Sequence, residues 1–162
     1  MLFRSNSYCF DPSPKFQYFN EYTKRAGYGG ELTESMSLQG SFWMLTREKY
    51  WELNVCDESF GSWGSMGIEI ACKFWLSGGS VMINHNTYYG HCFRTQGGDF
   101  GFPYALSGSQ VDHAKNTARE LFFKNQWPLQ TRPLSWLVER FKPPQWTDKD
   151  LQEIKKFDHL VV

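Results

Sequence analysis

One mixed α/β domain with a helical C-terminal tail is the fold that this sequence predicts. The chain has 162 residues, which is enough for a single domain with its own hydrophobic core. Short apolar segments alternate with segments of helical period along the first two thirds of the chain. Segments of helical period that follow prolines occupy the last third. Together these observations favour one small sheet with flanking helices.

The first predicted elements are two aromatic-rich strands within residues 2–10 and 15–25, on either side of the sequence DPSP. Asp and Pro favour turns, so this arrangement is typical of a hairpin. Phe19 and Tyr22 also fit a helical spacing, which leaves the second segment open between strand and helix.

Residues 26–35 are predicted as a loop because the sequence AGYGGELTES contains three glycines. Residues 38–46 (LQGSFWMLT) are predicted as a short buried strand that is entered through Gly40. Residues 47–54 are predicted as a short helix, in which Tyr50 and Trp51 are available for packing, together with Leu53.

A second helix is predicted over residues 68–76. Its apolar face contains Ile68, Cys72 and Trp75 at helical spacing, so these side chains are expected to be buried. Lys73 is expected to be exposed on the neighbouring face, four residues after Glu69 in an order of charges that stabilises a helix. Gly78 and Gly79 are expected to end this helix.

Residues 80–94 are predicted as one strand or two, with a break at residues 84–86, and residues 95–108 as a long glycine-rich loop. Ser109 and Asp112 resemble a capping box for a helix that ends near Lys124. The last predicted elements are two helices, over residues 132–141 and 143–156, and the second is expected to be capped by Thr147 and Asp150.

The composition excludes several classes of protein. Seventeen basic and 17 acidic residues give a formal net charge of zero, which argues against a nucleic-acid partner. Cys9, Cys56, Cys72 and Cys92 form no CxxC pair, so neither a zinc site nor a disulfide framework is expected. No apolar run reaches the length of a membrane span, and the N-terminal sequence lacks the apolar core of a signal peptide. These features predict a soluble, cytoplasmic protein with no membrane span.

Aromatic residues make up 18% of the chain. Most of them are expected to fill the core, and the remainder are available as flat platforms for sugars or bases.

Three glycine-containing loops are candidates for a binding site: Gly40–Ser41, residues 57–67 and residues 90–101. If the strands are neighbours, these loops meet at one edge of the sheet, where open α/β sheets bind ligands. Trp63 lies between glycines, and it is either a lid over the site or an anchor that holds its loop to the core.

Four further residues are candidate site residues, and three of them have an alternative interpretation. His91 is either a ligand of a divalent metal or a hydrogen-bonded structural residue. Arg94 is a candidate contact for phosphate. Glu69 and Asp57 are the candidate catalytic carboxylates; alternatively, Glu69 pairs with Lys73 on a solvated helix face and Asp57 caps a loop.

Residues 38–95 resemble the C-terminal half of family 2 (GT-A) glycosyltransferases, most closely the bacterial and phage branch and more distantly the polypeptide N-acetylgalactosaminyltransferases. The motifs that carry the resemblance are GSFWMLTREKYWEL, CDESFGSWGSMGIEIACKFWLSGG and GHCFR. The spacing between WG and W-x-x-GG is that of the family. Residues 99–108 and 133–146 also resemble the tail of the bacterial branch. The resemblance implies a partial GT-A (Rossmann-like) fold.

The resemblance also implies roles for individual residues. His91 falls on the metal-binding histidine, where the metal is usually manganese, and Arg94 on a basic residue that reaches the donor diphosphate. Trp63 falls on the lid tryptophan. Gly40, followed by Ser41, lies where the backbone approaches the donor sugar. Glu69 matches the second acidic residue of the helix-start motif.

Two departures from the family pattern stand out. The position of the catalytic Asp in many inverting members falls on Gly67, and the preceding acidic position on Met66. No general base is therefore assigned, and the choice between inversion and retention stays open. The nucleotide-binding half with its Asp-x-Asp motif is missing from this chain, as expected for a fragment, a split subunit or a decayed gene.

We therefore expect residues 1–105 to be the acceptor-side half of a GT-A domain and residues 106–162 to be a helical extension that packs on it. The first functional hypothesis is transfer of a sugar from a nucleotide-sugar donor to a glycan, protein or lipid-linked acceptor. It needs a divalent metal, Mn²⁺, bound together with the missing half, which a second chain would supply; the isolated chain is expected to be inactive. The alternative is a non-catalytic carbohydrate-binding or assembly module that uses the aromatic rings as platforms.

Overall fold

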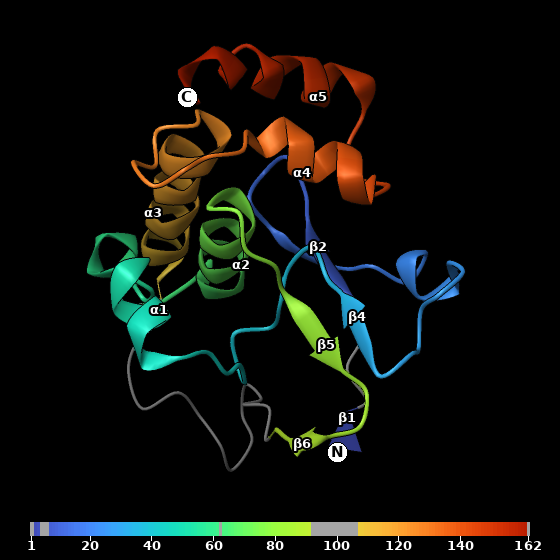
Figure 1. Cartoon of the computed structure of the whole chain (residues 1–162). Helices are drawn as coiled ribbons and strands as arrows, with labels where there is room; N and C mark the ends of the chain where they lie inside the picture. Colours follow the sequence, from blue (N-terminus) through green and yellow to red (C-terminus); the bar gives the residue numbers. More distant parts are fainter. Residues whose placement is uncertain (1, 4–6, 62, 92–106, 162) are drawn as a thin grey trace.

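The computed structural model describes residues 2–3, 7–61, 63–91 and 107–161. It has a mixed α/β fold, as predicted: helices gather in one part of the molecule and short strands in the other (Figure 1). The strands are β1 (Leu2–Phe3), β2 (Tyr8–Phe10), β3 (Phe16–Tyr18), β4 (Leu32–Glu34), β5 (Met82–Asn84) and β6 (Tyr89–Gly90).

The helices are α1 (Arg47–Glu52), α2 (Met66–Leu76), α3 (Gly108–Ala118), α4 (Leu134–Phe141) and α5 (Asp148–Lys155). A π-helical turn, Arg119–Phe123, continues α3. Short 3-10 helices lie at Tyr22–Lys24, Glu58–Phe60 and Asp158–Leu160. Among the described residues, no helix has both the length and the apolar character needed to cross a membrane.

The predicted hairpin at the N-terminus is confirmed. Strands β2 and β3 pair antiparallel, with Cys9 opposite Gln17. The Asp11 carboxylate closes the turn, because it accepts hydrogen bonds from the backbone N–H groups of Ser13 (2.8 Å) and Lys15 (3.1 Å). An Asp that bonds to the backbone just after it is the reason that this residue type favours turns.

Two predictions about the first strands and loops are wrong. Residues 26–35 include strand β4, which pairs antiparallel with β5 and places Thr33 opposite Ile83. Residues 38–46, expected to be a buried strand, have no strand assignment, and Met44 is 86% exposed. The β-type pattern is present in 38–46, but among the described residues no neighbouring strand pairs with it.

The predicted single sheet is also corrected. In the described parts of the chain, the strands form two-stranded antiparallel pairs: β1 with β6, β2 with β3, and β4 with β5. The β2–β3 pair is joined to the segment after β4 by an isolated bridge, in which Ser37 N–H donates to Tyr8 O. Residues 80–94 contain two strands, β5 and β6, as one of the two alternatives expected.

Helix α2 is the centre of the core. Ile68, Cys72 and Trp75 are buried as predicted, and Trp75 donates its indole N–H to Ser35 O at 2.9 Å. The Trp75 ring lies 5.3 Å from the ring of Phe141 on α4, so the C-terminal helices and α2 share one core. The predicted division into residues 1–105 and 106–162 stays a prediction, because residues 92–106 lie outside the described part.

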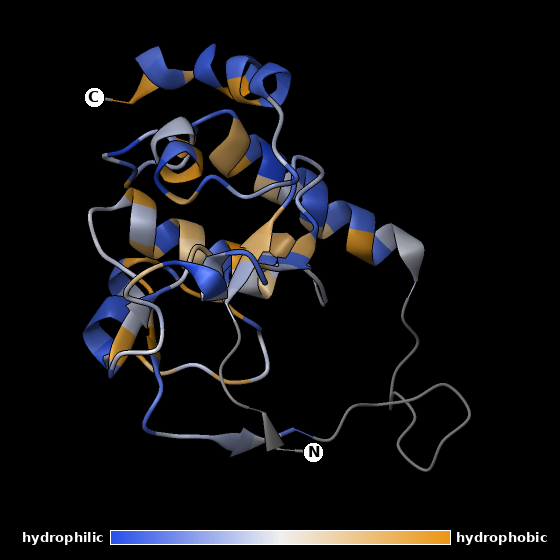
Figure 2. Cartoon of the chain, turned by 90° about the vertical axis from the view of Figure 1, so that its right-hand side faces the viewer, coloured by the Kyte–Doolittle hydropathy of each residue, from blue (hydrophilic) through white to orange (hydrophobic). Residues whose placement is uncertain are grey.

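The helix ends follow the predicted capping chemistry with one correction. Thr147 and Asp150 form a capping box at α5, as expected. The capping box of α3 is formed by Ser107 and Gln110 rather than by Ser109 and Asp112, so the helix begins two residues earlier. Figure 2 shows that the outermost helix, α5, is mostly hydrophilic, with apolar residues on the side that faces α4.

Candidate functional site

Two of the three predicted glycine loops lie near β6 or the start of α2. The Gly40–Ser41 loop contacts both elements, and residues 57–67 lead into α2. The Ser41 hydroxyl lies 2.8 Å from the Tyr89 hydroxyl, which donates a hydrogen bond to Gln39 Oε1 at 3.0 Å. The Phe42 ring stacks on the Tyr89 ring with centroids 5.0 Å apart. These contacts fix the Gly40–Ser41 segment beside β6, which ends one residue before His91.

Gly40 also lies against the first residue of α2. A Cβ atom at Gly40 would be 3.3 Å from the Met66 sulfur and 3.4 Å from its Cβ. Gly40 therefore permits a close approach between the loop and the helix. The atoms that approach it here belong to the Met66 side chain, whereas the resemblance implies an approach to the donor sugar.

Gly67, on the first turn of α2, occupies the most crowded position of this kind. A Cβ atom at Gly67 would lie 1.9 Å from the carbonyl oxygen of Leu38. The Ser37 hydroxyl donates to Gly67 O at 3.2 Å, which holds the two backbones together. The resemblance aligns the catalytic Asp of the family with Gly67. Since the Leu38 carbonyl occupies the space where a Cβ atom would lie, this position has no room for a carboxylate side chain unless the backbone at Leu38 moves.

Glu69 lies in a buried ionic cluster. One of its oxygens, Oε1, accepts hydrogen bonds from the Asp57 backbone N–H and from Lys73 Nζ, both at 2.9 Å. Lys73 Nζ also donates to Asn54 O at 2.5 Å and lies 3.7 Å from the Asp57 carboxylate. The Glu69–Lys73 pairing was one of the two interpretations of Glu69, but the face that carries it is not solvated.

The prediction that Lys73 is exposed is therefore wrong: both Lys73 (0% exposed) and Glu69 (2%) are buried. Helical periodicity places them off the main apolar face, and it contains no information about the loop that covers them. A buried lysine is tolerated when its charge is paired and hydrogen-bonded. Here the carbonyl at Asn54 and the two carboxylates fulfil that requirement.

Asp57 is held at the start of the Glu58–Phe60 helical turn. Its carboxylate accepts a hydrogen bond from the Ser59 backbone N–H at 2.9 Å, which is the loop-capping role considered from the sequence. Burial acts to raise the pKa of Asp57, but the bonds from Ser59 and the charge of Lys73 outweigh it, so the pKa lies below its usual value. A carboxylate with a lowered pKa is a weak proton acceptor. A catalytic role for Asp57 or Glu69 stays a prediction.

Trp63 is 42% exposed, so it is not an anchor buried in the core. The glycines on either side have left-handed backbone conformations, with φ of 81° at Gly61 and 115° at Gly64. A Cβ atom at Gly61 would lie 3.2 Å from His113, and one at Gly64 would lie 3.1 Å from Ala114. The loop is therefore packed against α3, and its tryptophan is accessible at the surface.

His91 follows β6 and is partly buried, whereas Arg94 lies outside the described residues. Within the described residues, no group of three His, Cys, Asp or Glu side chains is arranged to hold a metal ion. The described residues therefore do not fit a complete metal site, because a divalent cation needs several ligands held in place.

The cysteines that the structure describes are free thiols. Burial raises the pKa of Cys72 well above the usual range and that of Cys9 to about 12. Both thiols stay protonated and unreactive at neutral pH. Cys92 lies outside the described residues.

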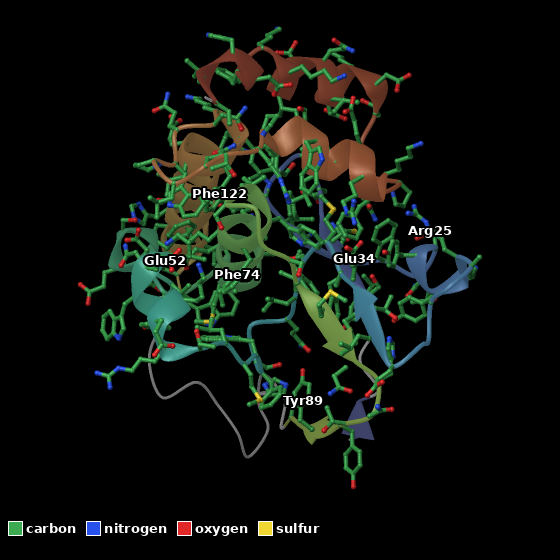
Figure 3. All side chains as sticks on the ribbon, in the orientation of Figure 1. Arg25, Glu34, Glu52, Phe74, Tyr89 and Phe122 are labelled. Carbon is green, nitrogen blue, oxygen red and sulfur yellow. The ribbon has the colours of Figure 1, made fainter. Side chains whose placement is uncertain are left out.

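A pocket of about 570 Å³ lies between residues 38–46, α2 and the β5–β6 region. Its walls are largely aromatic or apolar, and they include Phe42, Trp43, Phe74, Met82, Tyr88 and Tyr89. We call this the aromatic pocket. Figure 3 shows two of its walls, with Phe74 on α2 and Tyr89 at β6.

Most of the pocket walls were missed by the sequence interpretation. Phe74 and Met82 were treated as ordinary parts of a helix and a strand. Two adjacent aromatic pairs next to glycines, Phe42–Trp43 after Gly40 and Tyr88–Tyr89 before Gly90, are the signal that the sequence offers for this pocket. Tyr88 is 69% exposed.

No family model matches this chain. It is similar to the Caenorhabditis elegans protein named "Probable N-acetylgalactosaminyltransferase 9", with 26% identity over 133 residues, covering 74% of this chain and 22% of that protein. It is also similar to polypeptide N-acetylgalactosaminyltransferase 11 of Xenopus tropicalis (29% over 85 residues; 52% of this chain, 13% of the relative). N-acetylgalactosaminyltransferase 7 of Homo sapiens matches at 29% over 79 residues (49% and 12%).

The chain is thus distantly homologous, over part of its length, to polypeptide N-acetylgalactosaminyltransferases. It spans about a fifth or less of the length of these curated relatives. The narrower assignment to a bacterial and phage branch stays a prediction.

Proposed function

We propose that this chain is the acceptor-side part of a glycosyltransferase that moves a sugar from a nucleotide-sugar donor to a hydroxyl group of a glycan, protein or lipid-linked acceptor. The observation that carries the proposal is the homology to proteins named N-acetylgalactosaminyltransferases, which reaches 74% of this chain in one relative. The placement of Gly40, Ser41 and β6 around one region supports it. The stereochemical outcome and the sugar are left open.

In this reaction the bond between the sugar and the diphosphate breaks, a bond to the acceptor oxygen forms, and the acceptor hydroxyl loses its proton. The aromatic pocket offers flat rings for the apolar face of a sugar, and the hydroxyl groups of Ser41 and Tyr89 offer hydrogen bonds to its polar edge. Glu69 is enclosed by Asp57 and Lys73, so we assign it the positioning of the Trp63 loop rather than contact with substrate.

The donor diphosphate carries negative charge that has to be neutralised as it leaves. We propose Arg94 as one cationic contact and His91 as one ligand of a divalent metal, Mn²⁺. The described residues do not by themselves make a metal site, so the carboxylates of an Asp-x-Asp motif would have to come from outside them.

Isothermal titration calorimetry tests this proposal directly. We expect Mn²⁺ and a uridine or guanosine diphosphate sugar to bind the 162-residue chain weakly, because one imidazole cannot hold the cation. Adding a polypeptide that carries the Asp-x-Asp half, fused or separate, should give tight binding that His91→Ala abolishes. His85→Ala is the matched control, since His85 bonds to the Thr33 hydroxyl at 3.0 Å in the β4–β5 pair.

Two results would contradict the proposal. Tight binding to the isolated chain that depends on His91 would mean that it is not half of a site. Tight binding to the combined protein that His91→Ala leaves unchanged would remove His91 from the metal site.

The aromatic pocket also favours a second function, a non-catalytic carbohydrate-binding module. Such a module binds oligosaccharide without nucleotide or metal. Titration of the chain with oligosaccharides in the presence of a chelator separates the two functions: binding that Tyr88→Ala weakens at least tenfold would favour the module, and its absence would favour the transferase.

A further inference from the structure

The segment Gln39–Thr46 combines a strand-forming sequence with an unpaired backbone. Its centre reads SFWMLT, which is rich in residue types that favour strands. Phe42 (50% exposed) and Met44 (86%) point to solvent, whereas Trp43 and Leu45 pack against the core. This alternation with a period of two is the side-chain pattern of a β-strand.

Neither edge of this segment has a strand partner among the described residues. The nearest backbone bonds lie at its ends, where Ser37 N–H donates to Tyr8 O and Tyr50 N–H donates to Thr46 O. Between them, Gly40 and Ser41 form a turn, and residues 42–45 after it make no backbone hydrogen bond to another described segment. Backbone N–H and C=O groups in this state form a template for another strand.

The segment is nevertheless held in place. Tyr89 bonds to Gln39, lies within hydrogen-bonding distance of Ser41 and stacks on Phe42, while the Trp43 ring lies 6.5 Å from the Tyr50 ring of α1. In Figure 1 the segment passes below α2 and ends at α1. A fixed edge loses little conformational entropy when a partner strand is added, which favours binding.

The aromatic pocket beside the segment indicates the chemistry of the partner. Among the described residues that line it, Lys49 alone is charged, and its ammonium group is already paired with Glu52 at 2.6 Å. The partner should therefore be apolar at the positions that enter the pocket, with no charged group there.

We propose that Gln39–Thr46 is a docking edge that takes up an extended segment of additional polypeptide as a new β-strand, whose alternate apolar side chains fill the aromatic pocket. Two observations favour additional polypeptide over a small ligand: a backbone edge that pairs with no strand in the described part of the chain, and the much greater length of the relatives, of which this chain covers 12 to 22%. The proposal does not depend on sugar transfer and holds for any polypeptide that completes the domain.

A displayed library of random eight-residue peptides is the probe, screened against the whole chain. We expect enrichment of sequences in which apolar β-branched or aromatic residues alternate with other residues. In hydrogen–deuterium exchange, an enriched peptide should slow exchange of backbone amides within residues 39–46 at least tenfold, because only pairing buries those N–H groups in a ladder.

Met44 is 86% exposed, so its substitution leaves the core intact, but its side chain lines the aromatic pocket. Each proline variant is therefore compared with an alanine variant that loses the same side chain, which separates backbone pairing from side-chain contact. The first variant is Met44→Pro, and the second combines it with Ser41→Pro. Together the two prolines remove backbone N–H donors from both edges of the segment, so we expect peptide binding to weaken at least tenfold. Met44→Ala combined with Ser41→Ala removes the same side-chain contacts, including the one between Ser41 and Tyr89, but keeps the backbone donors, so it should lose much less. Circular dichroism confirms that each variant is folded.

Three outcomes would overturn the proposal: no alternating sequence is enriched, the enriched peptides protect no amide within 39–46, or the proline and alanine variants bind equally well. Protection that is already present without peptide and disappears on dilution would mean that a second copy of this chain occupies the edge. In that case a second copy of this chain, and not an additional polypeptide, would be the partner of the edge.

Discussion

The helical side of the molecule, formed by α2, α3 and α4, differs sharply from the groove side, formed by residues 38–46, β5 and β6. On the helical side, large rings such as Trp75 and Phe141 are buried, and the Trp75 indole N–H donates to Ser35 O. On the groove side, Phe42, Met44 and Tyr88 are each at least half exposed. Exposed aromatic and apolar side chains that gather in one place mark a surface that binds something.

The contrast extends to charges and backbone. The buried Lys73 on the helical side has every requirement met by Glu69, Asp57 and a backbone carbonyl. On the groove side, the backbone of residues 42–45 makes no hydrogen bond to another described segment. We infer that the chain stabilises its helical side with its own residues and leaves the groove side to be completed by a ligand or partner.

The largest expected difference between the two sides is the response to removal of one ring. Trp75→Ala should lower the free energy of unfolding by about 3–5 kcal/mol, because it empties a buried site, and it also leaves Ser35 O without its indole donor. Phe42→Ala, the matched change on the groove side, should cost about 0.5 kcal/mol or less. Urea denaturation of both variants makes the comparison, and equal losses would end the distinction between the sides.

The next effect concerns the buried ionic cluster. Lys73→Met should cost roughly 3–5 kcal/mol, since it leaves the Glu69 carboxylate buried without its cation. In the double variant Lys73→Met with Glu69→Leu, no charge is stranded, and part of the loss should be recovered. If the double variant were as unstable as the sum of the two single variants, the pair would not be coupled.

Gly67 tests the contact that joins the two sides. Gly67→Ala should cost about 1–3 kcal/mol, because its methyl group would collide with the Leu38 carbonyl and force a backbone shift. Gly30→Ala is the control, as a Cβ there meets no atom within 4 Å. Thermal melting of the two variants suffices. A Gly67→Ala protein as stable as the control would mean that a side chain, including the catalytic Asp of the resembling family, fits at this position.

The smallest expected effect is the pH dependence at Asp57. Its pKa is lower in the folded protein than the ordinary value of 3.8, so the ionised carboxylate stabilises the fold above that value. This stability is lost as pH falls through the folded pKa, and we expect about 0.2–1 kcal/mol for such a partly solvated pair. Asp57→Asn retains a capping side chain and should flatten that part of the stability profile measured from neutral pH down to about pH 3. An unchanged profile would contradict the assignment.

Local chemistry in the sequence was sufficient for several elements. The turn at Asp11, the helix of residues 66–76 and the capping box at Thr147 depend on neighbours within four residues, so the pattern of adjacent residues specified them. Burial of Ile68, Cys72 and Trp75 also followed from helical period alone. The candidate loop at Gly40–Ser41 was found because glycine and small polar residues mark close approach.

Only the tertiary structure decided the rest. Whether Lys73 is solvated depends on where residues 54–60 fold. Whether residues 38–46 form a strand depends on a partner strand, because the ladder hydrogen bonds of a strand are made to another segment. The close packing of the Leu38 carbonyl against Gly67, which leaves no room for a Cβ atom, and the walls of the aromatic pocket likewise join residues that are distant in sequence. The sequence determined which segments were able to be helices, strands and loops; burial, pairing and pocket formation were set by long-range contacts that no local pattern encodes.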